Sequence, residues 1–340
     1  MEVTVLFSVF ILGLILGIPI AATLGLSSLV YIIISGIPAV IMPQKMYAGM
    51  DVFVLLSIPG FILAGNLMNH GGITTRIVRF ANSVVGWIKG GLGLTNIAAS
   101  MLFGGITGTA VADAASIGGV MIPGMKKAGY PADFSAAVTA ASSTVGPIIP
   151  PSVPMIIVGA LSGISVGQMF LAGAIPGILM GLAMMVTAYL ISIKYGYPSQ
   201  SWRGFNEVVR SFSNAFWALA MTFLIIYGLL SGFSTPTETA VVASLYAFVV
   251  GTFIYRELPL RAVPKILVDS AISASGILIL VGFANVFGWI LVSERIPQAI
   301  AVGVLSITEN KYLVILLINI LLLFVGMFME TIAALIILFV

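Results

Sequence analysis

The sequence predicts an all-α polytopic membrane protein with re-entrant helical hairpins, discontinuous helices and inverted repeats. Of its 340 residues, 60% are hydrophobic and only 7% are charged, whereas soluble domains average about a quarter charged residues. Its mean hydropathy is +1.19. Apolar runs of about twenty residues recur, which is the length of a bilayer-spanning helix, while a transmembrane barrel would show alternating segments of about ten residues. A soluble globular protein is excluded.

The N-terminal region predicts two or three spans and one interfacial helix. Residues 3–35 are apolar over about 50 Å of helix, too long for one simple span. The expected break is Gly17-Ile18-Pro19, which leaves either one kinked helix or two. Residues 36–49 are predicted to form a Pro/Gly loop, and residues 50–69 a further span. Residues 73–87 place Arg76 and Arg79 among apolar residues, which is typical of an amphipathic helix at the membrane surface.

Residues 91–125 predict a re-entrant helical hairpin. The apolar segments 91–103 and 110–125 are each too short to span comfortably, and the glycine-rich residues 104–109 join them. Basic residues flank both ends of the hairpin: Arg76, Arg79 and Lys89 before it, and Lys126 and Lys127 after it. The positive-inside rule therefore places both ends at the cytoplasmic face.

Residues 132–163 predict one crossing that is broken near its middle. Gly146-Pro147 and Pro150-Pro151 interrupt it, because proline lacks an amide donor and clashes with the preceding helical turn. Irregular backbone at membrane depth survives only where protein buries it or where it lines a water-filled cavity. Two hydroxyl-rich breaks so close together, at residues 104–109 and 142–147, therefore predict a binding site.

The remainder predicts spans at residues 167–193, 212–231, 236–254 and 266–292, a short element at 297–308, and a second interrupted segment at 312–340. Residues 326–334 can be aligned with residues 105–110, which suggests a second broken helix. Paired broken helices in an inverted repeat indicate the binding site of a secondary transporter. The expected organisation is an N-terminal scaffold at 1–87, a first transport-domain half at 88–165, connecting and scaffold spans at 166–295, and the start of a second hairpin at 296–340. Since the sequence stops inside that hairpin, we expect a C-terminally incomplete chain.

The expected site combines hydroxyls and backbone oxygens that suit a monovalent cation, with a half-helix N-terminus at Thr109 for a substrate carboxylate. An alternative is that the small residues only allow close helix packing. The candidate binding residues are Gly105, Thr107, Gly108, Thr109, Asp113, Ser142, Ser143, Thr144, Gly146, Pro147, Glu238, Glu330 and Thr331. Sodium is expected at Gly105, Thr107, Ser143 and Gly146.

The three candidate carboxylates have different alternatives. Asp113 lies one turn into the second hairpin arm, where an intramembrane carboxylate suggests function but also suits a helix start. Glu238 follows Thr235 and Pro236 in the pattern of a capping box. Glu330 lies beside Thr331 in the second break and shows no such pattern.

Enzymatic and ATP-driven classes are not supported. The sequence shows no nucleotide-binding P-loop, metal-ligand cluster or catalytic triad. It has no cysteine, which excludes disulfides and thiolate chemistry. No cofactor is expected other than sodium as a coupling ion.

Two stretches resemble a known family. The run GGITGTAVADAASIGGVMIPGMKKAGYPADFSAAVTAASSTVGPIIPPSVPMIIVGALSGISVGQMFLAGAIPG closely resembles the large membrane subunit of tripartite ATP-independent periplasmic (TRAP) transporters, and SGFSTPTETAVVAS is similar to another block of that family. The resemblance implies sodium-coupled uptake of an organic anion, such as a C4-dicarboxylate, another carboxylate or sialic acid, across the bacterial inner membrane. It also implies a periplasmic solute-binding protein, a small four-helix membrane subunit and an elevator motion. The alternatives are a sodium/dicarboxylate symporter that needs no binding protein, a channel and a membrane scaffold.

Overall fold

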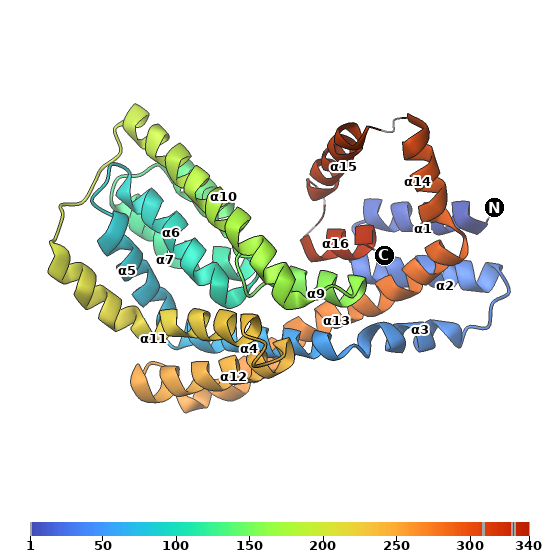
Figure 1. Ribbon diagram of the computed structural model, residues 1–340, viewed down its shortest axis with the longest axis horizontal. Coiled ribbons are helices and arrows are strands. Elements are labelled where there is room, and N and C mark those ends of the chain that lie inside the picture. Colours follow the sequence, from blue (N-terminus) through green and yellow to red (C-terminus); the bar gives the residue numbers. More distant parts are fainter. Residues whose placement is uncertain (1, 308–309, 328, 330, 340) are drawn as a thin grey trace. The chain divides into compact units, whose positions relative to one another are not determined.

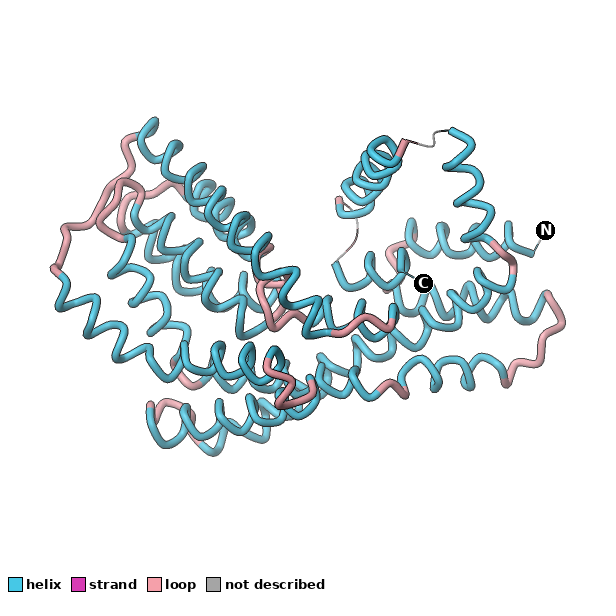
Figure 2. The backbone as a smooth tube through the Cα atoms, viewed as in Figure 1, coloured by secondary structure: helices cyan, strands magenta, loops and turns pink. Residues whose placement is uncertain are grey.

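The computed structural model describes residues 2–307, 310–327, 329 and 331–339. Within these ranges the chain is helical and has no strand (Figures 1 and 2). Five described segments are long and apolar enough to cross a membrane: Phe53–His70, Val166–Tyr195, Phe205–Leu229, Pro236–Ile254 and Leu260–Ser293. The all-α polytopic prediction is therefore confirmed.

The chain divides into two compact units, Met1–Leu55 with Ser275–Val340, and Leu56–Ala274. The helices of the N-terminal part are α1 (Glu2–Ile15), α2 (Ile20–Ile34), α3 (Ile41–Met50), η1 (Phe53–Leu56), α4 (Ser57–His70) and α5 (Ile73–Val85). The central helices are α6 (Gly91–Thr107), α7 (Ala110–Lys127), α8 (Ala132–Ser143), α9 (Val153–Ser162) and α10 (Val166–Tyr195). They are followed by α11 (Phe205–Leu230), α12 (Pro236–Val249), η2 (Val250–Ile254), η3 (Leu260–Ala262), α13 (Val263–Ser293), α14 (Ile296–Ile307), α15 (Lys311–Gly326) and α16 (Thr331–Phe339).

In the first unit, residues 3–35 form two helices rather than one kinked helix. Gly17 has a φ of 71°, in the left-handed region that glycine adopts at little cost, and α1 and α2 pack against each other. A Cβ at Gly13 would lie 2.7 Å from Cγ2 of Thr23. Close packing at small residues is the usual basis of helix association in lipid, where burial of apolar surface supplies no driving force.

The predicted Pro/Gly loop at residues 36–49 is wrong in its second half, because residues Ile41–Met50 form the helix α3. Pro43 is the third residue of this helix. In the first turn of a helix the amide that proline lacks has no intrahelical partner to lose, so proline is tolerated there. The sequence pattern of Pro38, Pro43 and Gly49 is therefore compatible with a helix that starts three residues after the first proline and ends just after the glycine.

In the second unit, the loops at residues 86–90, 128–131 and 196–204 gather at one end of the helices (Figure 2). The Tyr130 hydroxyl donates to the Pro198 carbonyl (2.7 Å), and it accepts from the Leu92 amide (3.3 Å). Burial raises the pKa of the Tyr130 phenol, which keeps it protonated as a donor. The Gln200 amide donates to the Gly86 carbonyl (3.1 Å). The start of α6 and the end of α7 therefore lie at the same end, as a re-entrant hairpin requires.

The helix α5 is amphipathic as predicted. Its buried face includes Ile73, Ile77 and Ala81, and it packs on α6 and α11. The opposite face carries the two arginines, and each has a carboxylate partner that is distant in sequence. Arg76 is 2.7 Å from Glu257, and Arg79 is 3.5 Å from Glu207.

Candidate functional site

The first predicted break lies between α6 and α7. Gly108 ends α6 with a φ of 62°, and Thr109 is extended, with φ −138° and ψ 140°. The Thr109 hydroxyl accepts from the Ala112 amide (3.4 Å) and so caps α7. Thr107 is the last residue of α6, and its side chain lies outside the described part of the structure. The hairpin tip therefore consists of one left-handed glycine and one capping threonine.

The second predicted break lies between α8 and α9, at residues 144–152. The Gly146 amide donates to the Ser143 carbonyl (3.2 Å), and the Ile149 amide donates to the Val145 carbonyl (3.0 Å), so the backbone winds through turns. Ser152 is fully buried. Its hydroxyl donates to the Pro147 carbonyl and accepts from the Met155 amide, which caps α9.

The two breaks contact each other, backbone against backbone. The Val153 amide donates to the Gly108 carbonyl (3.3 Å). A Cβ at Gly104 would lie 2.7 Å from the Gly146 Cα, and a Cβ at Gly108 would lie 2.6 Å from the Pro151 carbonyl oxygen. We call this contact between residues 104–109 and 144–153 the seam. It admits only glycine at these positions, because real Cβ atoms do not approach backbone so closely.

Beside the seam lies a buried polar cluster of α6 and α8, made of Asn96, Ser100, Thr139, Ser142 and Ser143. The Asn96 amide donates to the Thr139 hydroxyl (2.7 Å), and the Ser100 and Ser142 hydroxyls are 3.0 Å apart. The Ser143 hydroxyl donates to the Thr139 carbonyl (2.8 Å). The cluster thus contains the two predicted serines and three residues that the sequence analysis missed.

A sequence signal for the missed residues existed. Asn96 and Ser100 are four residues apart, and Ser135, Thr139 and Ser143 continue at the same spacing on α8, so each set lies on one helix face. Thr222 was also missed: it lies within the apolar helix α11, and its Cγ2 would be 2.9 Å from a Cβ at Gly105. Polar residues at helical spacing inside apolar segments are the pattern to look for in such chains.

Asp113 lies on α7 next to this cluster and is completely buried. The hydroxyls of Ser100 and Ser143 face its carboxylate. Even so, neither carboxylate oxygen has a hydrogen-bond partner among the described groups. An isolated buried carboxylate carries a desolvation penalty of several kcal/mol, roughly, unless a positive charge or a proton compensates it. Of the predicted carboxylates in the described part of the chain, Asp113 is the one that lies next to the seam.

No described contact brings Glu238 to the seam. Glu238 accepts from the backbone amide of Thr235 (2.8 Å) and from its hydroxyl (2.9 Å), which forms the expected capping box at the start of α12. Glu330 lies outside the described residues. Thr331 begins α16, in the other unit.

Thr235→Ala is expected to lower the free energy of unfolding by about 1 kcal/mol, because the α12 amide at Glu238 loses its side-chain acceptor. Thermal unfolding of the purified protein measures this. The matched control is Thr235→Ser, which keeps the hydroxyl and is expected to unfold within a few tenths of a kcal/mol of the parent. Equal unfolding of the alanine and serine variants would contradict the capping role.

Comparison with known proteins now adds to this geometry. The family model for the tripartite ATP-independent periplasmic transporter, DctM component, matches residues 7–340. The chain is 43% identical over 323 residues to the sialic acid TRAP transporter large permease protein SiaM of Vibrio cholerae, covering 95% of this chain and 76% of the relative. It is 33% identical over 345 residues to the C4-dicarboxylate TRAP transporter large permease protein DctM of Rhodobacter capsulatus, covering 97% and 78%.

A third relative extends the range of cargoes. The chain is 35% identical over 331 residues to the 2,3-diketo-L-gulonate TRAP transporter large permease protein YiaN of Escherichia coli, covering 97% of this chain and 78% of the relative. TRAP large permeases are bacterial inner-membrane transporters, not enzymes, and they work with a small membrane subunit and a periplasmic binding protein. The family match over nearly the whole chain and these identities show that the chain belongs to the TRAP transporter large permease family.

Proposed function

We propose that this chain is the membrane subunit of a sodium-coupled transporter that imports an organic anion by an elevator movement. A periplasmic binding protein delivers the substrate, and a small four-helix membrane subunit completes the assembly. The observation that carries the proposal is the seam: two interrupted helices meet backbone to backbone, next to a buried carboxylate without a described partner. Paired broken helices of this kind are the usual sites for substrate and coupling ion in secondary transporters.

The proposed sodium position is bounded by Asp113, Ser100 and Ser143. A hard monovalent cation prefers oxygen ligands, and this group offers one carboxylate and two hydroxyls. Sodium there would neutralise the carboxylate, which has no described hydrogen-bond partner. The predicted ligands Gly105, Thr107 and Gly146 belong to the adjacent seam and would add backbone oxygens.

The proposed substrate position is the start of α7. The first amides of a helix lack intrahelical partners and carry a partial positive charge, which attracts a carboxylate. Sialic acid, C4-dicarboxylates and 2,3-diketo-L-gulonate, the cargoes in the names of the relatives, are all organic acids. We therefore propose an organic carboxylate as the substrate class.

Reconstitution tests this proposal. The full-length permease, its small subunit and its binding protein are placed in proteoliposomes, and uptake of radiolabelled sialic acid and succinate is followed with an inward gradient of sodium or of choline. We expect uptake only with sodium and only with the binding protein. Uptake that persists without the binding protein would favour the symporter alternative. Conductance without substrate-coupled sodium movement would identify a channel, and no ligand-dependent stabilisation at all would point to a scaffold.

Thr109→Ala combined with Thr144→Ala is expected to reduce sodium-driven uptake about tenfold, a factor that corresponds to about 1.4 kcal/mol. Thr109 caps α7 at the proposed carboxylate position, and Thr144 lies at the end of α8. The control is Thr187→Ala on α10, because its hydroxyl donates to its own helix at 2.9 Å, as Thr144 does at 2.7 Å. Unchanged uptake in the double variant would show that the site is misplaced.

A further inference from the structure

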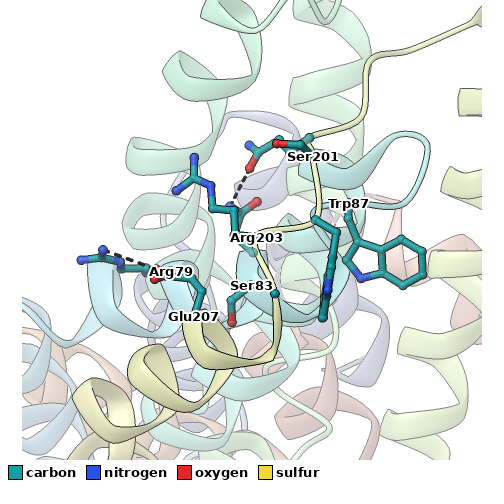
Figure 3. A pocket seen from close by; sticks show the side chains of 10 residues that line it. Arg79, Ser83, Trp87, Ser201, Arg203 and Glu207 are labelled. Carbon is teal, nitrogen blue, oxygen red and sulfur yellow. Dashed lines mark hydrogen bonds and ion pairs between the residues drawn. The ribbon is translucent and has the colours of Figure 1, made fainter.

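A polar pocket in the second unit lies between α5 and the connector that precedes α11 (Figure 3). Its lining includes Arg79, Trp87, Trp202, Arg203 and Glu207. In Figure 3 the arginines and Glu207 lie on one side of the pocket and Trp87 lies on the other. The transport site does not use these residues, so the pocket calls for a separate explanation.

The pocket is held in place by hydrogen bonds between its two sides. The Asn82 side-chain amide donates to the Gln200 side-chain oxygen (2.9 Å), and the Gln200 backbone amide donates to the Gly86 carbonyl (3.1 Å). The Ser83 and Ser211 hydroxyls are 2.7 Å apart. The connector is therefore fixed against α5, and the pocket is preformed.

The charge of the pocket is positive. Arg79 and Glu207 are 3.5 Å apart, so their opposite charges cancel. Arg203 forms no ion pair with any residue in the described ranges. The 26-residue helix α11 also begins here, at Gly204, which provides no side-chain cap, so the positive end of the helix adds to the guanidinium group. Arg203 is exposed, and an arginine in this position can hold an anion, because its guanidinium group matches phosphate geometry with two parallel donors.

The size of the pocket favours a compact anion. Its volume is about 40 Å³, which is room for a few water molecules, because one water needs about 10–15 Å³ of such a cavity. The pocket therefore takes a compact polar group, with the rest of a larger ligand outside.

The surroundings of the pocket place it at the membrane surface. Trp87 and Trp202 meet edge to face at 5.6 Å, and both are about half exposed. Tryptophan is enriched at the level of lipid headgroups. The same end of the second unit carries Lys89, Lys126, Lys127 and Lys194, which marks the cytoplasmic face. That face of the membrane is rich in anionic lipids, which attract basic segments by about 1 kcal/mol per charge.

We propose that this pocket binds the phosphate headgroup of an anionic phospholipid at the cytoplasmic membrane surface. The Arg203 guanidinium group and the first amides of α11 hold the phosphate. Arg79 neutralises Glu207 at the rim, so that this carboxylate does not repel the phosphate, and the two tryptophans lie among the neighbouring headgroups. The occupant is a membrane lipid rather than a soluble phosphate, because the half-exposed tryptophan pair places the rim of the pocket at the level of lipid headgroups.

The test is a titration of the detergent-solubilised protein, with binding followed by thermal unfolding and by native mass spectrometry. The probes are phosphatidylglycerol, phosphatidylcholine and inorganic phosphate. We expect phosphatidylglycerol to bind and to raise the unfolding temperature, and the other two to act at least about tenfold more weakly. Arg203→Gln is expected to weaken phosphatidylglycerol binding about tenfold, and Arg79→Gln combined with Arg203→Gln to abolish it. Binding should weaken as the salt concentration rises.

The matched control is Arg210→Gln, because Arg210 is an exposed arginine on α11, seven residues after Arg203, and does not line the pocket. Its binding should stay within about twofold of the parent. If Arg203→Gln and Arg210→Gln weaken phosphatidylglycerol binding equally, the binding depends only on general surface charge, and the proposal is overturned. Equal binding of phosphatidylcholine would do the same. Binding of inorganic phosphate as tightly as phosphatidylglycerol would assign the pocket to a soluble anion and would overturn the lipid assignment.

Discussion

Gly108→Ala is expected to reduce substrate uptake about a hundredfold, because the new Cβ would lie 2.6 Å from the Pro151 carbonyl oxygen at the seam. The steric conflict costs about 1–3 kcal/mol. The left-handed φ of 62° costs a non-glycine residue a further 1–2 kcal/mol, roughly. A total of about 3 kcal/mol corresponds to a factor of about one hundred. Initial rates of uptake in proteoliposomes measure the effect, and thermal unfolding reports the accompanying loss of stability.

Alanine variants of two helical glycines separate the cost of the steric conflict from the cost of the left-handed backbone. Gly104 has ordinary helical backbone, and its Cβ would lie 2.7 Å from the Gly146 Cα, so Gly104→Ala tests the close approach alone. Gly119 lies on α7 with no atom within 4 Å of its Cβ position. Gly119→Ala should keep full uptake and gain up to about 1 kcal/mol of helix stability. If Gly104→Ala and Gly119→Ala behave alike, the seam is not a required contact.

The sequence predicted the breaks well because their causes are local. A left-handed glycine followed by a capping threonine ends one helix and starts the next, and Gly108 and Thr109 do so here. Prolines forbid a continuous helix at residues 147–151 in the same way. The capping box of Thr235 and Glu238 is likewise a pattern of four consecutive residues. These features could therefore be predicted without any information on tertiary structure.

The sequence was a poorer guide where a residue's role depends on its position within a helix or on partners that are distant in the chain. Pro43 reads as a helix breaker, yet in the first turn of α3 it breaks no hydrogen bond. The ion-pair partners of Arg76 and Arg79 were not predicted, because Glu257 and Glu207 lie more than a hundred residues away along the chain. Nothing in a single sequence links such residues. The sequence predicted that the two breaks share one site, but it did not predict that their backbones are in contact at Gly104 and Gly146.

Asp113→Asn is expected to raise the half-saturating sodium concentration for uptake about tenfold or more, because it removes the one charge that the described residues place at the proposed sodium position. It should also change stability in a way that depends on sodium. Without sodium, the wild-type protein bears the cost of a buried carboxylate that has no described partner, so the neutral amide should raise the unfolding temperature. With saturating sodium, the wild-type protein gains stability by mass action, and the variant should not.

The comparison with Asp133→Asn makes this result specific. Asp133 is an exposed carboxylate in the first turn of α8, and its loss should leave both the sodium dependence of uptake and the sodium-dependent rise in unfolding temperature intact. The two readouts also separate the possible roles of Asp113. A site that only positions the helices would lower uptake equally at all sodium concentrations. A proton carrier would make uptake follow a pH gradient without sodium. A tenfold shift in sodium dependence, together with a higher unfolding temperature in sodium-free buffer, is expected only if the Asp113 carboxylate is charged and balances the coupling ion.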